Sequence, residues 1–257
     1  MDADGLRTLF DLSGRTAIIT GGTRGIGFTL AQAHLAAGAS VVITGRSEDR
    51  CTEARQLLEA QAPGRVAAVA AHMGDLDQVR SLVAQAITAF GGLDIVVNNA
   101  ATALIQQFGS ITPEAWDKSI SVNVAGPLFL VQEALPHLTA SGRAAILNLV
   151  SPAAFMFTGY MPLYAAGKAA LTALTRSMAS AFAPHGIRVN ALAPGPVDTE
   201  MVRKNSPEFI QAMADGTLLK RIARPDEMVG PALLLTSDAG SYITGQVLLA
   251  DGGTVPR

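Results

Sequence analysis

The chain has 257 residues, 49% of them hydrophobic and 16% charged, and its formal net charge is -2. This composition excludes an intrinsically disordered protein, and the near-neutral charge without a basic block argues against nucleic acid or an anionic membrane surface as the main partner. The single cysteine, Cys51, excludes an internal disulfide bond and is typical of a reducing compartment.

The beginning of the chain has no sign of a targeting segment. Residues 1–15 alternate charged and apolar side chains without a continuous apolar stretch, so we expect no signal peptide. No apolar run in the sequence approaches the ~20 residues that a membrane-spanning helix needs. These features predict a cytoplasmic protein with no membrane partner.

Short apolar segments alternate with longer segments of helical pattern along the whole chain. The short segments are rich in Val, Ile and Ala without regular polar alternation, which is typical of strands buried on both faces of a parallel sheet. The predicted strands are 16–20, 40–44, 66–71, 95–98, 145–150, 188–193 and 246–250. The predicted helices are 25–37, 47–61, 75–90, 113–141, 164–185 and 225–236.

This alternation predicts the fold class. Successive βαβ crossovers build an α/β doubly wound sheet, and no linker, repeat or low-complexity tract interrupts the pattern. We therefore expect a single domain over residues 1–257, with a Rossmann-type parallel sheet of seven strands and helices on both faces. Residues 198–224 follow a Pro-Gly-Pro break and are too long for a simple connection, which predicts a substrate lid.

A glycine-rich turn follows the first predicted strand and opens the first predicted helix. Gly21, Gly25 and Gly27 have the spacing G-x-x-x-G-x-G. Glycines permit a tight turn and a close approach of a pyrophosphate to the backbone, and the helix N-terminus offers free N–H groups. The spacing differs from G-x-G-x-x-G, and a glycine-rich turn without a ligand is the alternative. The position directly after the first strand favours a dinucleotide site.

The end of the second predicted strand bears on the choice of dinucleotide. NAD sites usually place an acidic residue there for the ribose 2′-hydroxyl, whereas the 2′-phosphate of NADP requires positive charge. Here the strand is followed by Gly45 and Arg46, and no acid precedes Glu48. Arg46 and Arg24 could hold a phosphate from two sides, although either arginine alone is more often an ordinary solvated side chain. Together they predict NADP(H).

A tyrosine and a lysine stand four residues apart, Tyr164 and Lys168, with Ser151 thirteen residues before the tyrosine. On a helix, side chains at i and i+4 share a face, so the ammonium can lie beside the phenol. A nearby positive charge lowers the pKa of a phenol from its usual ~10, which makes tyrosine a proton donor and acceptor near neutral pH. Alone, such a pair is more often an aromatic ring packed beside a solvated lysine.

These motifs, taken in order, point to one family. The chain resembles the short-chain dehydrogenase/reductase family, in the subgroup with TGxxxGxG and YxxxK motifs, and the resemblance extends essentially end to end. The residues that carry it are the glycine turn, Asn98-Asn99-Ala100-Ala101, Asn123, Ser151, Tyr164, Lys168, Pro194-Gly195-Pro196-Val197-Asp198-Thr199, Tyr242-Ile243-Thr244-Gly245-Gln246 and Asp251-Gly252-Gly253. The resemblance implies an NADP(H)-dependent oxidoreductase that acts on a ketone or a secondary alcohol.

By position, the resemblance implies a catalytic tetrad. Tyr164 would protonate the developing alkoxide while Ser151 holds the carbonyl oxygen. Lys168 would lower the pKa of Tyr164 and bind the nicotinamide ribose, and Asn123 would hold a water that links Lys168 to solvent. The alternatives are a strand-end cap for Ser151 and a hydrogen-bonding role inside a helix for Asn123. The resemblance also implies the cofactor-binding residues Gly21, Thr23, Arg24, Gly25, Ile26, Gly27, Arg46, His72, Met73, Asn99, Ala100, Tyr164, Lys168, Pro194, Gly195, Val197 and Thr199.

Three positions depart from the family pattern. The Asn-Asn-Ala-Gly that usually follows the fourth strand ends here in Ala101, which places a methyl group where the backbone often passes closest to the cofactor. The acid that commonly meets the adenine is replaced by His72, with Met73 following, so backbone groups are left to supply this contact. The basic residue that carrier-protein reductases often have before the Gly-Ile of the sixth strand is His185 here.

The substrate pocket that the resemblance implies is apolar, which favours a hydrophobic ketone or alcohol over a sugar acid. It draws on 101–104, 152–161, Val197, Met201, Phe209 and Met213. No metal site is expected, because the four histidines are scattered and one cysteine cannot build a zinc site. The alternatives are a 3-oxoacyl-carrier-protein reductase, a dinucleotide-binding regulatory protein, and a sugar-nucleotide epimerase, which usually has another glycine spacing. The family's habit of tetramerising implies a homotetramer.

Overall fold

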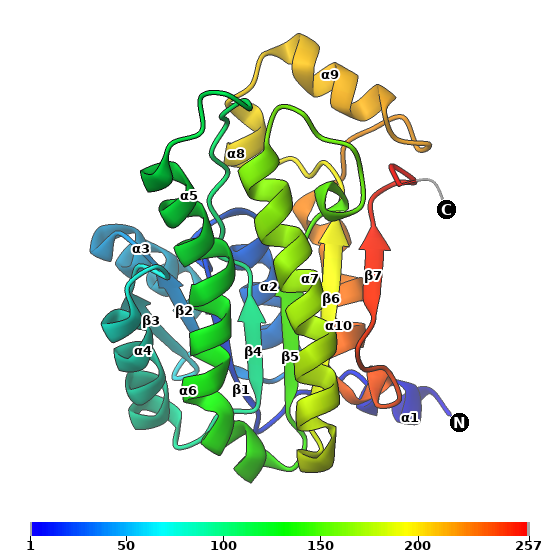
Figure 1. The fold of residues 1–257 in the computed structure, drawn as a ribbon. Coiled ribbons are helices and arrows are strands. Elements are labelled where there is room, and N and C mark those ends of the chain that lie inside the picture. Colours follow the sequence, from blue (N-terminus) through cyan, green and yellow to red (C-terminus); the bar gives the residue numbers. More distant parts are fainter. Residues whose placement is uncertain (1, 256–257) are drawn as a thin grey trace.

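The computed structural model describes residues 2–255, and its centre is one seven-stranded sheet. All neighbouring strands are parallel, in the order β3-β2-β1-β4-β5-β6-β7 (Figure 1). The strands are β1 (Thr16–Thr20), β2 (Ser40–Gly45), β3 (Val66–Ala70), β4 (Ile95–Asn98), β5 (Ala145–Leu149), β6 (Arg188–Pro194) and β7 (Val247–Ala250). The predicted Rossmann-type fold is confirmed, and every strand lies within one residue of its predicted bounds at either end.

Helices cover both faces of the sheet and bury its apolar strands, so that every residue of β1 and β4 is buried. One hydrophobic core lies between the sheet and α2 (Gly25–Ala36), α3 (Glu48–Glu59) and α10 (Val229–Thr236). The other lies between the sheet and α4 (Leu76–Phe90), α6 (Gly126–Ser141) and α7 (Pro162–Phe182). In Figure 1 the helices α6 and α7 stand in front of the sheet, and α2 and α10 stand behind it.

The predicted continuous helix over 113–141 is wrong. These residues form α5 (Pro113–Ile120), a π-helical turn η1 (Ser121–Ala125) and α6. Pro127 explains the interruption, because proline has no N–H and its ring clashes with the carbonyl four residues earlier, which here belongs to Asn123. The π-helical turn therefore contains one of the predicted catalytic residues. A short helix, α1 (Ala3–Thr8), also precedes β1, where the sequence pattern predicts none.

Residues 198–222, between β6 and α10, extend away from the sheet, and the two ends of this segment lie side by side. It contains α8 (Glu200–Arg203) and α9 (Pro207–Asp215), which lie beyond the carboxyl ends of the strands (Figure 1). A parallel bridge pairs Val197 with Ala223, and the N–H of Asp198 donates to the Ala223 oxygen at 2.8 Å. The two ends of residues 198–222 are therefore joined at their base.

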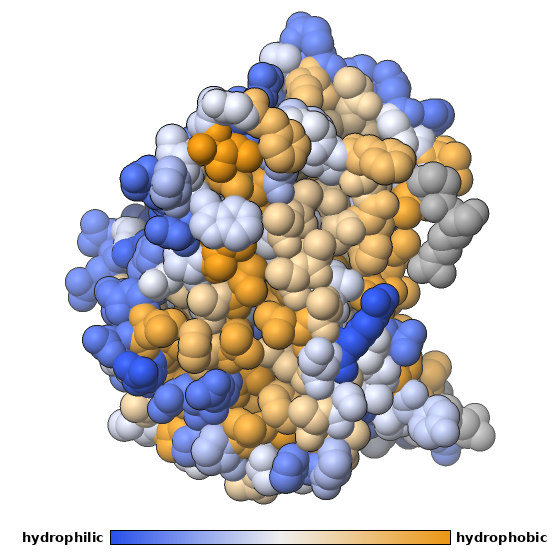
Figure 2. All heavy atoms as spheres, viewed as in Figure 1, coloured by the Kyte–Doolittle hydropathy of each residue, from blue (hydrophilic) through white to orange (hydrophobic). Residues whose placement is uncertain are grey.

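The face formed by α6 and α7 exposes apolar side chains over a broad area (Figure 2). Phe129 on α6 is 37% exposed, and Trp116 on α5 is 47% exposed. Within residues 2–255, no helix combines the length and the apolar character that crossing a membrane requires.

Candidate active site

The carboxyl ends of the central strands gather most of the predicted site residues. The glycine turn follows β1, Asn99 follows β4, Ser151 follows β5 and Gly195 follows β6. In a parallel sheet these ends lie along one edge, where doubly wound folds bind their ligands. Residues from four separate parts of the sequence are thus brought to one edge of the sheet (Figure 1).

Tyr164 and Lys168 lie on α7, which begins at Pro162, two residues before the predicted start. Proline suits the first turn of a helix because the N–H that it lacks has no intrahelical partner there. The Lys168 Nζ lies 5.5 Å from the centre of the Tyr164 ring and donates a hydrogen bond to the Leu149 carbonyl oxygen at 2.6 Å. Lys168 is only 2% exposed, so its ammonium is buried beside the phenol as the spacing predicts.

The pKa values of this pair are set mainly by burial. Burial lowers the pKa of Lys168 to about 8, and the ammonium still carries its charge at neutral pH. Burial also raises the pKa of Tyr164, while a side-chain hydrogen bond with Ser151 acts in the opposite direction. The net shift of Tyr164 is therefore opposite to the predicted lowering, because removal of the phenolate from water outweighs the groups that stabilise it. Tyr164 is held in its protonated form, ready to donate.

Ser151 follows β5 in an extended conformation and begins a 3-10 turn, Pro152–Ala154. Its Oγ accepts a hydrogen bond from the Ala153 N–H at 3.2 Å. The hydroxyl therefore caps the turn, as one alternative predicts, and it also acts to lower the pKa of Tyr164 against the effect of burial. The cap fixes the orientation of the hydroxyl beside the phenol.

Asn123 is fully buried within the π-helical turn. Its Oδ1 accepts from the Thr102 N–H at 2.9 Å, and its Nδ2 donates to the Thr102 oxygen at 2.9 Å and to Ser119 Oγ at 3.3 Å. Gly167 packs directly against this residue, since a Cβ on Gly167 would lie 3.0 Å from the Asn123 Cβ. The side chain thus fixes the segment after β4. Because both amide hydrogens are in use, the predicted water relay would depend on carbonyl oxygens of Asn123.

The glycine turn is packed tightly against the end of β4. Gly21 has a φ of 65°, and a Cβ on this residue would lie 2.9 Å from Asn99 Nδ2. Gly27 has no room for a side chain, because a Cβ would overlap the Gly21 carbonyl oxygen. Asn99 Nδ2 donates to the Thr20 oxygen at 2.7 Å, and Thr20 Oγ1 accepts from the N–H groups of Asn99 and Ala100 at 2.9 and 3.0 Å. Thr20 is therefore a structural member of the site that the glycine pattern alone did not reveal.

The turn fits the pyrophosphate of a dinucleotide. Arg24 is the N-cap residue of α2, in an extended conformation, and no side chain caps the helix. The first N–H groups of α2 are thus left without a side-chain partner, at the positive end of the helix dipole. Thr23 packs against Gly45, whose Cβ would lie 2.7 Å from Thr23 Cγ2, and Ile26 packs into the core behind the turn. Thr199 covers Gly25 from the other side, 3.3 Å from where a Cβ would lie.

The two arginines predicted to hold a 2′-phosphate have different surroundings. Arg46 is exposed just beyond β2, and no ion pair joins it to another residue within 2–255. Arg24 Nη1 donates to Glu200 Oε2 at 2.6 Å, and Arg50 Nη1 lies 3.6 Å from the same oxygen. Arg24 is therefore paired with a carboxylate on α8. The ion pair with Glu200 and the position of Arg50 were not predicted.

The remaining predicted cofactor residues lie along the same edge. The N–H of Gly74 donates to His72 Nδ1 at 3.2 Å, and Met73 is 4% exposed with its side chain in the core. An adenine contact at Met73 would therefore come from its main chain. After Pro194, a Cβ on Gly195 would lie 2.7 Å from the Asp251 Cα, and Val197 is 3% exposed. The turn after β6 is packed against the chain beyond β7.

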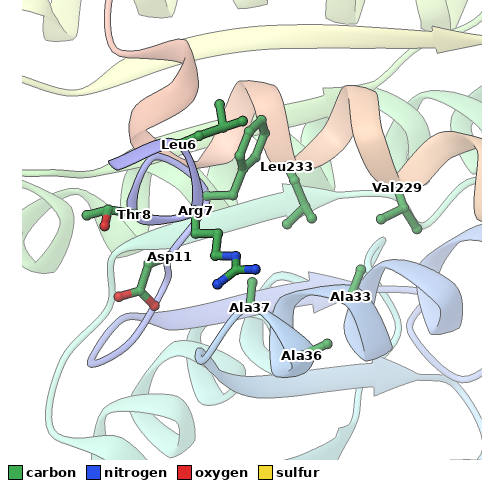
Figure 3. Close-up of a pocket in the computed structure, with 10 residues that line it drawn as sticks. Leu6, Arg7, Thr8, Asp11, Ala33, Ala36, Ala37, Val229 and Leu233 are labelled. Atoms are coloured by element: carbon green, nitrogen blue, oxygen red, sulfur yellow. The ribbon is translucent and has the colours of Figure 1, made fainter. Parts of the chain in front are cut away.

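Two other features of the described residues do not contribute to this site. In residues 2–255, no group of three or more His, Cys, Asp or Glu side chains could hold a metal ion. A groove of about 730 Å³ lies between α1, α2 and α10, where α2 ends and not where the glycine turn begins (Figure 3). Its lining residues are Leu6, Arg7, Thr8, Phe10, Asp11, Ala33, Ala36, Ala37, Val229 and Leu233.

Known proteins resemble this chain over nearly its whole length. The family model described as Enoyl-(Acyl carrier protein) reductase matches residues 21–255. The human protein named dehydrogenase/reductase SDR family member 4 is 34% identical, over 100% of this chain and 93% of that protein. A structure of gluconate 5-dehydrogenase from Burkholderia cenocepacia with NADP and tartrate has a TM-score of 0.91 and 32% identity, over 97% and 98% of the two chains. L-sorbose reductase from Gluconobacter frateurii with NADPH and L-sorbose has a TM-score of 0.91 and 30% identity, over 97% and 99%.

Proposed function

Because this chain belongs to the short-chain dehydrogenase/reductase family, we propose that it transfers a hydride between NADP(H) and a ketone or secondary alcohol. One observation carries the proposal: Tyr164 and the buried ammonium of Lys168 lie together on α7, and the Ser151 hydroxyl lowers the pKa of the tyrosine against the effect of burial. A structural lysine has no reason to be 2% exposed without a carboxylate partner, because a buried charge is costly. A role in proton transfer explains why this lysine is buried.

In the proposed mechanism the protein handles the proton. Bound NADPH supplies the hydride in the reductive direction. Ser151 positions the carbonyl oxygen of the substrate, and Tyr164, which burial keeps protonated, donates its proton to the developing alkoxide. The phenolate that remains is stabilised by the Lys168 ammonium, which is cationic at pH 7 because its pKa is about 8. Asn123 holds the loop after β4 in place through Thr102.

The rim of the proposed substrate site is apolar. Three segments beyond the sheet edge expose apolar side chains: Ile105, Phe108, Phe155, Met156, Phe157, Met201, Phe209, Leu218 and Leu219. Tyr160 and Phe209 contact each other edge to face with ring centres 6.1 Å apart, which joins the segment after β5 to α9. Contiguous exposed apolar side chains mark binding surfaces. They support a hydrophobic ketone or alcohol as substrate, in contrast to the gluconate and L-sorbose named for the two similar structures.

The proposed function is tested by cofactor titration followed by turnover. NADPH and NADH are titrated by fluorescence, and NADPH oxidation is then measured with a hydrophobic ketone, an acetoacetyl thioester and L-sorbose. We expect tighter binding of NADPH and the highest kcat/KM with the ketone. Preference for the thioester would assign a 3-oxoacyl-carrier-protein reductase, and preference for L-sorbose would contradict the hydrophobic substrate. Tight binding without any turnover would indicate a dinucleotide-binding regulatory protein.

The NADP preference predicts the effect of a charge reversal at Arg46. Arg46→Asp should weaken NADPH binding by about 100-fold, because a carboxylate would face the 2′-phosphate, and should change NADH binding less than about three-fold. The measurement is the ratio of the two dissociation constants. Arg55→Asp, on the exposed face of α3, is the matched control and should leave the ratio unchanged. Equal weakening of both cofactors by Arg46→Asp would exclude Arg46 from the phosphate site.

We also propose that the protein is a homotetramer. The broad apolar face of α6 and α7 supports this assembly (Figure 2), because exposed apolar surfaces of this extent are typical of interfaces between subunits.

A further inference from the structure

A single carboxylate on the first residue of α8 gathers three cations. Glu200 Oε2 accepts a hydrogen bond from Arg24 Nη1 at 2.6 Å and lies 3.6 Å from Arg50 Nη1. Its other oxygen lies 3.3 Å from Lys204 Nζ. Arg24 is the residue directly before α2, Arg50 lies in the first turn of α3, and Lys204 follows α8. The cluster therefore connects the glycine turn, the end of β2 and the segment beyond β6.

The cluster lies at the end of β2, where an NAD site usually has an acidic residue and this sequence has none. Arg24 belongs to the glycine turn, and Arg50 stands four residues after Arg46, on the helix that β2 leads into. Glu200 is the anion that these arginines contact, and it comes from 176 residues further along the chain than Arg24. A 2′-phosphate bound at the end of β2 would need the same guanidinium groups. The carboxylate and the phosphate are therefore alternatives for one set of cations.

The packing around Glu200 connects this competition to the predicted substrate lid, residues 198–224. Thr199, its neighbour, lies against Gly25 in the glycine turn, and residues 198–222 are tied at their base by the Val197–Ala223 bridge. Glu200 and its arginines are about half exposed, and isolated ion pairs of this kind contribute little to stability. The carboxylate can therefore be displaced by a better anion. A phosphate with a charge near -2 is such an anion.

From this arrangement we propose that Glu200 is a specificity-determining residue that competes with the 2′-phosphate of NADP(H) for Arg24 and Arg50. The inference rests on the proposed function, since it requires a dinucleotide at the glycine turn. In the absence of the phosphate, the carboxylate occupies the two guanidinium groups and offsets their mutual repulsion. Binding of NADP(H) transfers the arginines to the phosphate and releases α8, whereas binding of NAD(H) leaves the Glu200 contacts in place. Arg50 is then a third phosphate-binding cation, beside Arg24 and Arg46.

The test is a titration of wild-type protein and two variants with NADPH and with NADH. Glu200→Gln removes the competing charge, so we expect NADPH to bind about three- to ten-fold more tightly, with the NADH dissociation constant unchanged within about two-fold. Arg50→Gln should weaken NADPH by a similar factor and leave NADH unchanged. The gain from Glu200→Gln should shrink in 0.5 M salt, because exposed charges are then screened. Glu53→Gln, an exposed carboxylate on α3, controls for the change in net charge.

The outcomes separate this inference from the proposed function. If wild-type protein binds NADPH but Glu200→Gln weakens that binding, or shifts both cofactors equally, the competition is overturned and the proposed function stands. The same conclusion follows if Glu53→Gln matches the effect of Glu200→Gln. If wild-type protein binds neither cofactor, the glycine-turn site itself is wrong and both proposals fail. Tighter NADPH binding by Glu200→Gln alone, together with the loss in Arg50→Gln, supports the assignment.

Discussion

Replacement of Tyr164 by phenylalanine is expected to lower kcat by about 1,000-fold, with the NADPH dissociation constant changed less than about two-fold. The substitution removes only the hydroxyl that donates the proton, and a positioned general acid contributes roughly 100- to 10,000-fold to a rate. The ring still fills its place on α7 beside Lys168 Nζ, so the fold and the cofactor edge are unaffected. Steady-state kinetics with the best ketone, together with fluorescence titration of NADPH, measure both quantities.

A second tyrosine provides the control for this experiment. Tyr242 lies between α10 and β7 and is fully exposed, so Tyr242→Phe should leave both kcat and cofactor affinity unchanged. Retention of full turnover by Tyr164→Phe would remove the tyrosine from proton transfer. In that case Ser151, whose hydroxyl influences the pKa of Tyr164, would be the next candidate for the acid.

Replacement of Lys168 by methionine is expected to change activity and stability in opposite directions. Turnover should fall at least about 100-fold, because the phenolate loses the buried charge beside it. Stability at pH 7 should increase, since burial lowers the lysine pKa from 10.5 to about 8. That difference corresponds to about 3 kcal/mol against the charged form, and the lost hydrogen bond to the Leu149 oxygen offsets about 1 kcal/mol of the gain. The free energy of unfolding should therefore rise by about 2 kcal/mol.

The pH dependence of this gain follows from the direction of the shift. Below pH 8 the folded protein holds the full unfavourable charge, and the methionine variant is the more stable one. Between pH 8 and about 10.5 the unfolded chain binds more protons than the folded protein, so the wild-type protein gains stability as the pH rises. The advantage of Lys168→Met should therefore shrink across this window.

Urea denaturation at pH 7 and at pH 10 measures this change. Lys118→Met, on the exposed face of α5, is the control and should show no such pH dependence. Equal stability of Lys168→Met and wild-type protein at both pH values would show that burial of the Lys168 ammonium does not destabilise the folded protein.

The parts of the fold that the sequence predicts are those with strong local signals. The strands bury both faces and are therefore rich in Val, Ile and Ala, so their bounds agree with the structure within one residue. The helix over 113–141 fails as a continuous element because Pro127 interrupts a run of residues that is otherwise helical in pattern. The pattern of apolar residues gives no warning of a π-helical turn.

The features of the site that the sequence does not predict depend on contacts between residues far apart in the chain. The ion pair between Arg24 and Glu200 joins residues 176 positions apart, so no local pattern indicates it. Thr20 precedes the glycine turn, but it accepts hydrogen bonds from Asn99 and Ala100 in the segment after β4. The pKa of Tyr164 shifts upward because the fold partly buries the tyrosine, which the spacing to Lys168 does not reveal. Spacing identifies which side chains meet, whereas burial decides what charge they carry.

Because Val197 and Ala223 are bridged, the residues between them can change in length and sequence without disturbing the sheet. The backbone hydrogen bonds that close its base, each 2.8 Å long, hold the two ends together whatever lies between them. The entropic cost of closing a loop rises only slowly with its length, and the proton-transfer residues stand on β5 and α7, outside this excursion. Under the function that we propose, insertions, deletions and changes of polarity in residues 198–222 can therefore alter which substrates are accepted while the sheet and the chemistry stay intact. A scaffold built in this way can diversify its substrates through one segment of the chain.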